Sequence, residues 1–92
     1  MKTPIKIDDK LRSQLAQCSL AIGGLAKNCA RTLPENINFI EEISSLFNLV
    51  KVVVVENGST DSTRVQLNSW ANKNQTVRVV DGDLAAFPTK KL

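Results

Sequence analysis

Apolar residues follow two spacings along this chain, and the spacings divide it into alternating helices and strands. Between Leu33 and Phe47 they recur every three or four positions, which predicts an amphipathic helix whose apolar stripe packs on a sheet. Residues 50–55 contain four consecutive valines, and a valine run without alternation is typical of a parallel strand covered on both faces. A helix is therefore followed by a buried strand after a short connection.

Two further strands complete the sheet in this interpretation. Residues 18–22 are predicted to form a short buried strand that Gly23 and Gly24 break. Residues 76–80 are predicted to form a third strand, which an acid-glycine-acid turn closes. The order strand, helix, strand, helix, strand predicts a right-handed parallel sheet in the spatial order 3-2-1. We therefore expect an α/β fold, a three-layer half of a Rossmann-like domain.

Polar residues indicate where the two main helices begin. Thr32 and Glu35 have the spacing of a capping box, and Pro34 falls in the first turn, where its missing N–H is not needed. Ser59 or Thr60 is expected to cap the second helix. Each predicted helix start thus lies directly after a strand and a short loop.

Other polar and aromatic residues fit structural roles. Asp8 or Asp9 is expected to cap a short helix that precedes the first strand. Asp61 lies in the first turn of the last helix, where a carboxylate interacts favourably with the helix dipole. Trp70 falls on the apolar face of that helix, so we expect it in the core.

The composition fits a single small α/β domain of 92 residues, in which residues 1–7 and 85–92 are expected to be loose ends. The hydrophobic share of 42% and the charged share of 23% are typical of a soluble globular protein. The net charge of +3 comes from basic residues spread along the chain, without a basic block interleaved with aromatics. This pattern argues against a nucleic-acid partner and suits an anionic small ligand such as a nucleotide diphosphate.

The scarcity of histidine and cysteine limits the available chemistry. The chain has no histidine, and therefore no imidazole base or imidazole metal ligand. Cys18 and Cys29 fit no zinc or redox spacing, so we interpret them as buried, reduced thiols of a cytoplasmic protein. No apolar stretch is long enough to span a membrane, and residues 19–26 lack the basic flank of a signal peptide. We expect no membrane partner.

Residues 52–63 are the most informative segment. An apolar strand stops at Glu56, Asn57 and Gly58, and a helix start rich in hydroxyls and acids follows. The acid and the amide therefore lie at the carboxyl end of a parallel strand, where open α/β sheets bind their ligands. A carboxylate there can accept from a base N–H or from ribose hydroxyls, and glycine lets the backbone approach a ligand closely. The helix N-terminus that follows favours phosphate.

This segment resembles the end of the second strand in GT-A fold glycosyltransferases, where a valine-rich strand leads into the sequence Gly-Ser-Thr-Asp-x-Thr. Residues 20–28 resemble the first strand of that family and the loop after it, and the resemblance covers about residues 19–84. It implies a nucleotide-sugar donor whose base or ribose contacts Glu56. The residues that it implicates in nucleotide binding are Ala21, Ile22, Gly23, Glu56, Asn57 and Gly58.

Charged residues near the predicted strand ends are the candidates for the diphosphate and for a metal. Lys27 and Arg31 follow the first strand and are candidates for phosphate binding, although solvated cations near a helix start would have the same pattern. The family's catalytic centre needs an Asp-x-Asp motif that holds a divalent metal. Asp81 and Asp83 have that spacing, but they follow the third strand directly, whereas the family's motif comes a strand later. We interpret them as a turn and assign no catalytic residue and no metal site.

Two functions of different classes stay open on the sequence alone. The chain is either a truncated, glycosyltransferase-like portion that binds a nucleotide-sugar donor, or a non-enzymatic assembly protein that reuses this half-fold. Catalysis of the hexosyltransferase class, with Mn²⁺ or Mg²⁺, is implied only for a complete enzyme, so no cofactor is required here. In the second case the first strand exposes its edge, and exposed edges invite pairing, so we expect a homodimer. A classical dinucleotide site is disfavoured because Gly23 and Gly24 lack the third glycine of its fingerprint.

Overall fold

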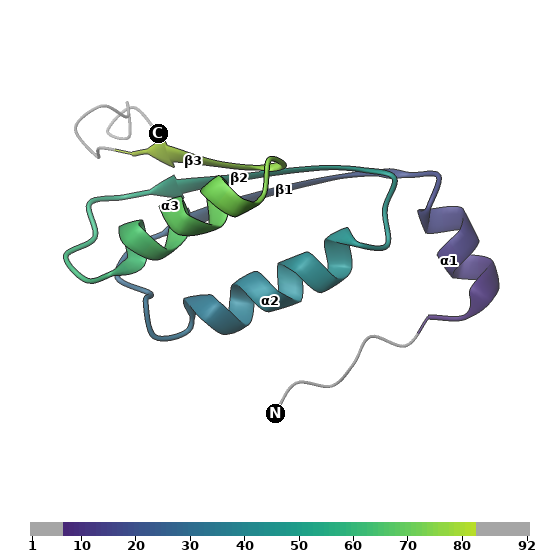
Figure 1. Ribbon diagram of the computed structural model, residues 1–92, viewed down its shortest axis with the longest axis horizontal. Helices are drawn as coiled ribbons and strands as arrows, with labels where there is room; N and C mark the ends of the chain where they lie inside the picture. Colours follow the sequence, from purple (N-terminus) through teal and green to yellow (C-terminus); the bar gives the residue numbers. More distant parts are fainter. Residues whose placement is uncertain (1–6, 83–92) are drawn as a thin grey trace, which may run out of the picture.

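The computed structural model describes residues 7–82, which form a three-stranded sheet with three helices (Figure 1). The elements in chain order are α1 (Asp9–Leu15), β1 (Ser19–Ala26), α2 (Leu33–Ser44), β2 (Leu49–Glu56), α3 (Thr63–Lys73) and β3 (Val77–Asp81). All strands are parallel, and their order is β1-β2-β3. This confirms the predicted α/β fold and the predicted strand order, read from the opposite edge of the sheet.

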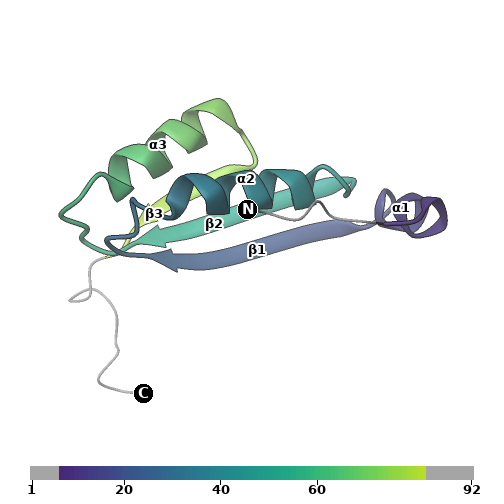
Figure 2. The ribbon, with the colours of Figure 1, turned by 90° about the horizontal axis from the view of Figure 1, so that it is seen from below.

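Helices α2 and α3 both cover the same face of the sheet (Figure 2). This follows from the topology, because two right-handed crossovers that advance in the same direction place both helices on one side. Residues 7–82 therefore build two layers, and the third layer that we expected is not among them. Burial along β2 alternates accordingly: Val52 and Val54 are 1% and 8% exposed, whereas Val53 between them is 39% exposed. The expectation that both faces of the valine strand are covered is wrong for the described part of the chain.

Strand β1 continues through Gly23 and Gly24, where we predicted it to break. Gly24 pairs with Val54, and the pairing of β1 with β2 ends only where Ala26 lies beside Glu56. Glycine weakens a strand but does not forbid extended backbone, and the ladder to β2 outweighs that weakness. The loop after β1 consequently begins several residues later than expected.

The helix starts differ from the sequence prediction. Thr32 makes no side-chain cap and has helical backbone angles; its Oγ1 donates to the carbonyl of Cys29 at 3.4 Å, so the capping box is not formed. Helix α3 begins at Thr63, after the residues expected to cap it. At α1 the prediction is confirmed, because Asp8 accepts a hydrogen bond from the backbone of Leu11 at 2.8 Å. The hydroxyl and acid residues before α3 instead hydrogen-bond to the loop after β1, at the carboxyl ends of the strands.

The core lies between the sheet and the two helices and consists of few residues. Its buried members are Ala26, Leu33, Val52, Val54, Leu67, Trp70 and Val77. Trp70 is buried as predicted, and its indole Nε1 donates to Glu41 Oε2 at 2.5 Å. Of the two thiols, Cys29 is half-buried and Cys18 is exposed, which corrects the expectation that both are buried. The predicted loose ends fall outside the described residues, apart from Ile7.

Candidate nucleotide-binding edge of the sheet

The carboxyl ends of all three strands meet at one edge of the sheet. Ala26 pairs with Glu56, and Glu56 pairs with Asp81, so the last residues of β1, β2 and β3 lie side by side. The loops that lead into α2 and α3 leave the sheet at this edge (Figure 1). Open α/β sheets bind ligands outside the carboxyl ends of their strands. This edge is therefore the candidate site.

Asn28 joins the two loops at this edge. Its backbone N–H donates to Ser59 Oγ at 2.9 Å, and its side-chain oxygen accepts from the backbone N–H of Thr60 at 2.8 Å. Asn28 has a φ of +49°, a left-handed conformation that asparagine tolerates better than most residues. The loop after β1 and the loop after β2 are thereby held together by reciprocal hydrogen bonds.

Asp61 and Thr63 form a second junction between the same loops. Asp61 Oδ1 accepts from the backbone and hydroxyl of Thr63 at 2.9 and 2.5 Å, and Asp61 Oδ2 accepts from the backbone of Ala30 at 3.2 Å. Thr63 Oγ1, which is fully buried, accepts from the backbone of Cys29 at 2.8 Å. The hydrogen bonds from Thr63 hold the pKa of Asp61 below its ordinary value, so this carboxylate stays charged. The polar side chains of the Ser-Thr-Asp-x-Thr sequence thus have hydrogen-bond partners within the chain.

Glu56 is an anion buried at the end of β2, with 1% of its surface exposed. Its Oε2 accepts from the backbone N–H of Ser59 at 2.7 Å, and its Oε1 lies 2.9 and 2.7 Å from the Nε and Nη2 of Arg64. The hydrogen bond from Ser59 and the pairing with Arg64 lower the pKa of Glu56 against the opposing effect of burial. Both carboxylate oxygens therefore have partners within the chain.

Arg64 connects the ends of two neighbouring strands. Its Nη2 lies 2.7 Å from Glu56 and 2.8 Å from Asp81 Oδ1, and these hydrogen bonds raise its pKa. Arg64 is not among the site residues predicted from the sequence. A signal was available, because a cation in the first turn of a helix opposes the helix dipole and so indicates a nearby acid. The carboxylates at the carboxyl ends of β2 and β3, Glu56 and Asp81, are the acids that it pairs with.

The predicted site residues fall into two groups. Asn57 and Gly58 lie at the edge: the backbone of Asn57 donates to Ala26 at 2.9 Å, and Gly58 has a φ of +61°, which favours glycine. Lys27 and Arg31 are exposed on the loop after β1, at the same edge. All four residues lie on the loops after β1 and β2, which leave the sheet at this edge.

Ala21, Ile22 and Gly23 belong to the second group and lie in the middle of the sheet. They pair with residues 51–53 of β2, whereas Glu56 pairs with Ala26. The separation arises because β1 is longer than predicted, so its carboxyl end is formed by later residues. The structure therefore does not bring these three residues together with Glu56.

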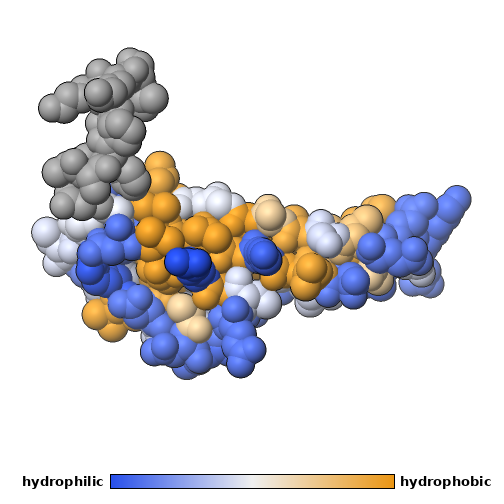
Figure 3. All heavy atoms as spheres, turned by 90° about the horizontal axis from the view of Figure 1, so that it is seen from above, coloured by the Kyte–Doolittle hydropathy of each residue, from blue (hydrophilic) through white to orange (hydrophobic). Residues whose placement is uncertain are grey.

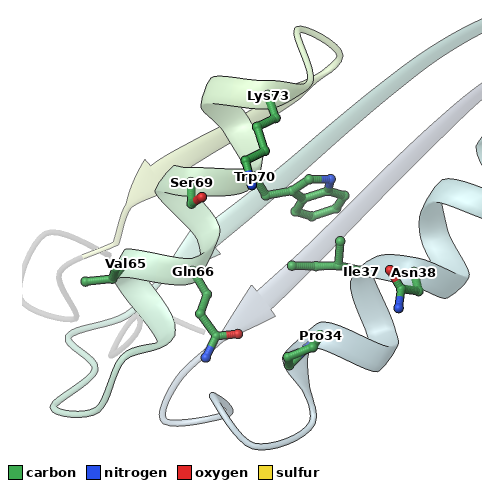
Figure 4. Close-up of a pocket in the computed structure, with 8 residues that line it drawn as sticks. All are labelled: Pro34, Ile37, Asn38, Val65, Gln66, Ser69, Trp70 and Lys73. Carbon is green, nitrogen blue, oxygen red and sulfur yellow. The ribbon is translucent and has the colours of Figure 1, made fainter.

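A hollow of about 440 Å³ lies between α2 and α3 (Figure 4). Its lining residues are Pro34, Ile37, Asn38, Val65, Gln66, Ser69, Trp70 and Lys73. Figure 4 shows Ile37 and Trp70 from the two helices directed toward each other, with Lys73 at one end. None of the predicted site residues lines it.

The described residues contain no cluster of three or more His, Cys, Asp or Glu side chains that could hold a metal ion. Asp81, one of the two metal candidates, is paired with Arg64, and Asp83 lies outside the described residues. Within residues 7–82 no helix has the length and apolar character needed to cross a bilayer. Comparisons with protein-family models, with curated proteins and with solved structures found no match.

Proposed function

We propose that this chain binds the nucleotide diphosphate of a nucleotide-sugar at the carboxyl edge of its sheet, as the donor-binding portion of a GT-A-like glycosyltransferase. The observation that carries the proposal is the alignment of Ala26, Glu56 and Asp81, which gathers the strand ends and both strand-to-helix loops at one edge. The segment that resembles the family lies at this same edge. The proposal concerns binding and assigns no catalytic group to the chain.

The contacts of Glu56 refine the role of each residue. Both oxygens of Glu56 already accept hydrogen bonds from Ser59 and Arg64. We therefore assign Glu56 the structural role of holding the loop after β2 in place. The ligand would then meet Asn57 and Gly58, which follow Glu56 at the mouth of that loop. Gly58 adopts a left-handed conformation that favours glycine, and because glycine has no side chain a base or ribose can approach its backbone closely.

The diphosphate is assigned to the cationic side of the edge. Lys27 and Arg31 are exposed on the loop after β1, which Asn28 fastens to the loop after β2. Two cations next to a fixed pair of loops can contact phosphate oxygens without an ordering step in the backbone. A Mn²⁺ or Mg²⁺ ion that accompanies the diphosphate would be brought by the ligand.

The test is a titration of the isotope-labelled chain with uridine and guanosine diphosphates and their sugar derivatives in the presence of Mg²⁺. Binding is measured by the change in backbone amide NMR chemical shifts. We expect shifts to concentrate at Lys27, Asn57 and Gly58. The double substitution Lys27→Ala and Arg31→Ala removes two exposed phosphate contacts, and we expect affinity to fall about tenfold.

The matched control is Lys51→Ala, which removes one exposed cation from the middle of β2. We expect affinity in this variant to stay within about twofold of the unchanged chain. The proposal fails if no nucleotide at millimolar concentration shifts the amides of this edge, or if the control weakens binding as much as the double variant.

A further inference from the structure

Strand β1 forms an edge of the described sheet, because within residues 7–82 it pairs with β2 alone. Figure 2 shows β1 along the margin of the sheet, with α1 beyond the start of the strand, where it leaves the margin uncovered. A strand at such an edge presents a row of backbone N–H and C=O groups that can pair with another strand.

Two backbone hydrogen bonds fix which residues present these groups. The carbonyl of Cys18 accepts from the backbone of Asn48, the residue just before β2. The carbonyl of Ala26 accepts from the backbone of Asn57, the residue just after β2. Both carbonyls therefore point toward β2. Successive residues of a strand direct their N–H and C=O groups to opposite sides. The groups directed to the open edge are therefore those of Ser19, Ala21, Gly23 and Leu25.

The side chains of β1 do not protect this edge. Natural edge strands are guarded by lysine, proline, bulges or inward charges, and the sequence of β1 contains no charged residue and no proline. A Cβ placed on Gly23 or Gly24 would meet nothing within 4 Å, and Ala21 is small. A second strand can approach the backbone of β1 without displacing side chains.

The edge is complementary to itself in an antiparallel arrangement. A two-fold axis through Ile22 would place Ser19 opposite Leu25 of the partner and Ala21 opposite Gly23 of the partner. Each residue directed to the edge then meets another such residue, which is the condition for hydrogen-bonded antiparallel pairs. This arrangement is also closed, because a two-fold interface uses the same surface on both copies.

We propose that β1 is a self-association site, through which two copies of this chain pair antiparallel about Ile22 and join their sheets into one. The axis is perpendicular to the sheet, so the helices of both copies lie on the same side. Ile22, half-buried against the core in one copy, is brought next to Ile22 of the partner. This inference is independent of nucleotide binding.

The first test is the mass in solution, measured by light scattering and sedimentation from micromolar to millimolar concentration. We expect twice the 10.1 kDa of a single chain at high concentration. Ala21→Pro removes an N–H directed to the edge without removing a hydrogen bond to β2, and proline is tolerated on edge strands. We expect it to raise the dissociation constant at least tenfold, whereas Ala21→Val, which keeps the N–H, leaves the dimer intact.

The second test addresses the pairing itself and does not depend on a proline variant folding. In a chain with Cys18 and Cys29 replaced by serine, Ile22→Cys places two thiols next to each other across the two-fold axis. Leu20→Cys, on the same face of the same strand, meets Gly24 of the partner and has no thiol opposite. We expect mild oxidation to cross-link the first variant at least tenfold faster.

Three results would overturn the proposal. One is a monomer at millimolar concentration. A second is cross-linking of the Leu20 variant as fast as that of the Ile22 variant, which would exclude pairing about Ile22. A folded Ala21→Pro variant that stays as dimeric as the unchanged chain would likewise exclude this edge.

Discussion

The two faces of the sheet are built from the same kind of residue and have different surroundings. On β2, Val52 faces the helices and is 1% exposed, whereas Val53, the next residue, faces away and is 39% exposed. Figure 3 views the face turned away from α2 and α3, which is largely hydrophobic with scattered polar residues. An apolar residue of this sheet is therefore part of the core only if the topology places a helix over it.

The largest expected effect tests this contrast directly. Val52→Lys would place a charge in the core, where desolvation costs more than about 4 kcal/mol, and we expect no cooperative unfolding transition. Val53→Lys places the same charge on the open face and should change the free energy of unfolding by less than about 0.5 kcal/mol. Urea unfolding followed by the fluorescence of Trp70 measures both. Equal destabilisation by the two lysines would refute the difference between the faces.

A smaller effect is expected at the two acids that share Arg64. Glu56→Gln removes a buried carboxylate with hydrogen bonds to Ser59 and Arg64, and we expect it to destabilise the fold by about 1–3 kcal/mol. Asp81→Asn removes the partner whose side chain is 69% exposed, and we expect less than about 1 kcal/mol because solvent screens that pair. The same urea experiment compares them. If Asp81→Asn proved the more damaging change, burial would not be what makes Glu56 important.

The smallest effect is the dependence of stability on pH. The pKa values of Glu56 and Asp61 are lower in the folded protein than in the unfolded chain, where ordinary values are about 4.3 and 3.9. Their contribution to stability is therefore complete above about pH 5 and is lost as pH falls through the folded pKa values. We expect the urea midpoint to be constant from pH 7 to 5 and to fall below about pH 4. The fall should be shallower in Glu56→Gln, and an unchanged slope in that variant would assign the effect to other groups.

Much of the fold could be predicted because its signals are local. The apolar stripe from Leu33 and the valines of β2 indicated the right element types, and short connections then restricted the strand order. The strand-end position of Glu56 also followed from sequence, since a strand that stops at an acid places that acid at the edge of the sheet.

Partners distant in the sequence could not be predicted. Ser59 and Thr60 resemble helix caps, yet they bind Asn28, which lies more than thirty positions earlier. Glu56 was expected to face a ligand, and in the folded chain its oxygens are taken by Ser59 and by Arg64, a residue of the next helix. A polar side chain can hydrogen-bond with any suitable group that the fold brings near it, whereas the spacing of residues in the sequence indicates only partners that are close along the chain.

Local sequence patterns were enough to identify the type of each main helix and strand and the order of the strands, because periodicity acts over a few neighbouring positions. The tertiary structure decided which face of each strand is buried, how far β1 extends past Gly23 and Gly24, and which groups hold Glu56. These properties depend on contacts between segments far apart in the chain. Two right-handed crossovers in one direction cover one face of a sheet whatever residues its other face carries.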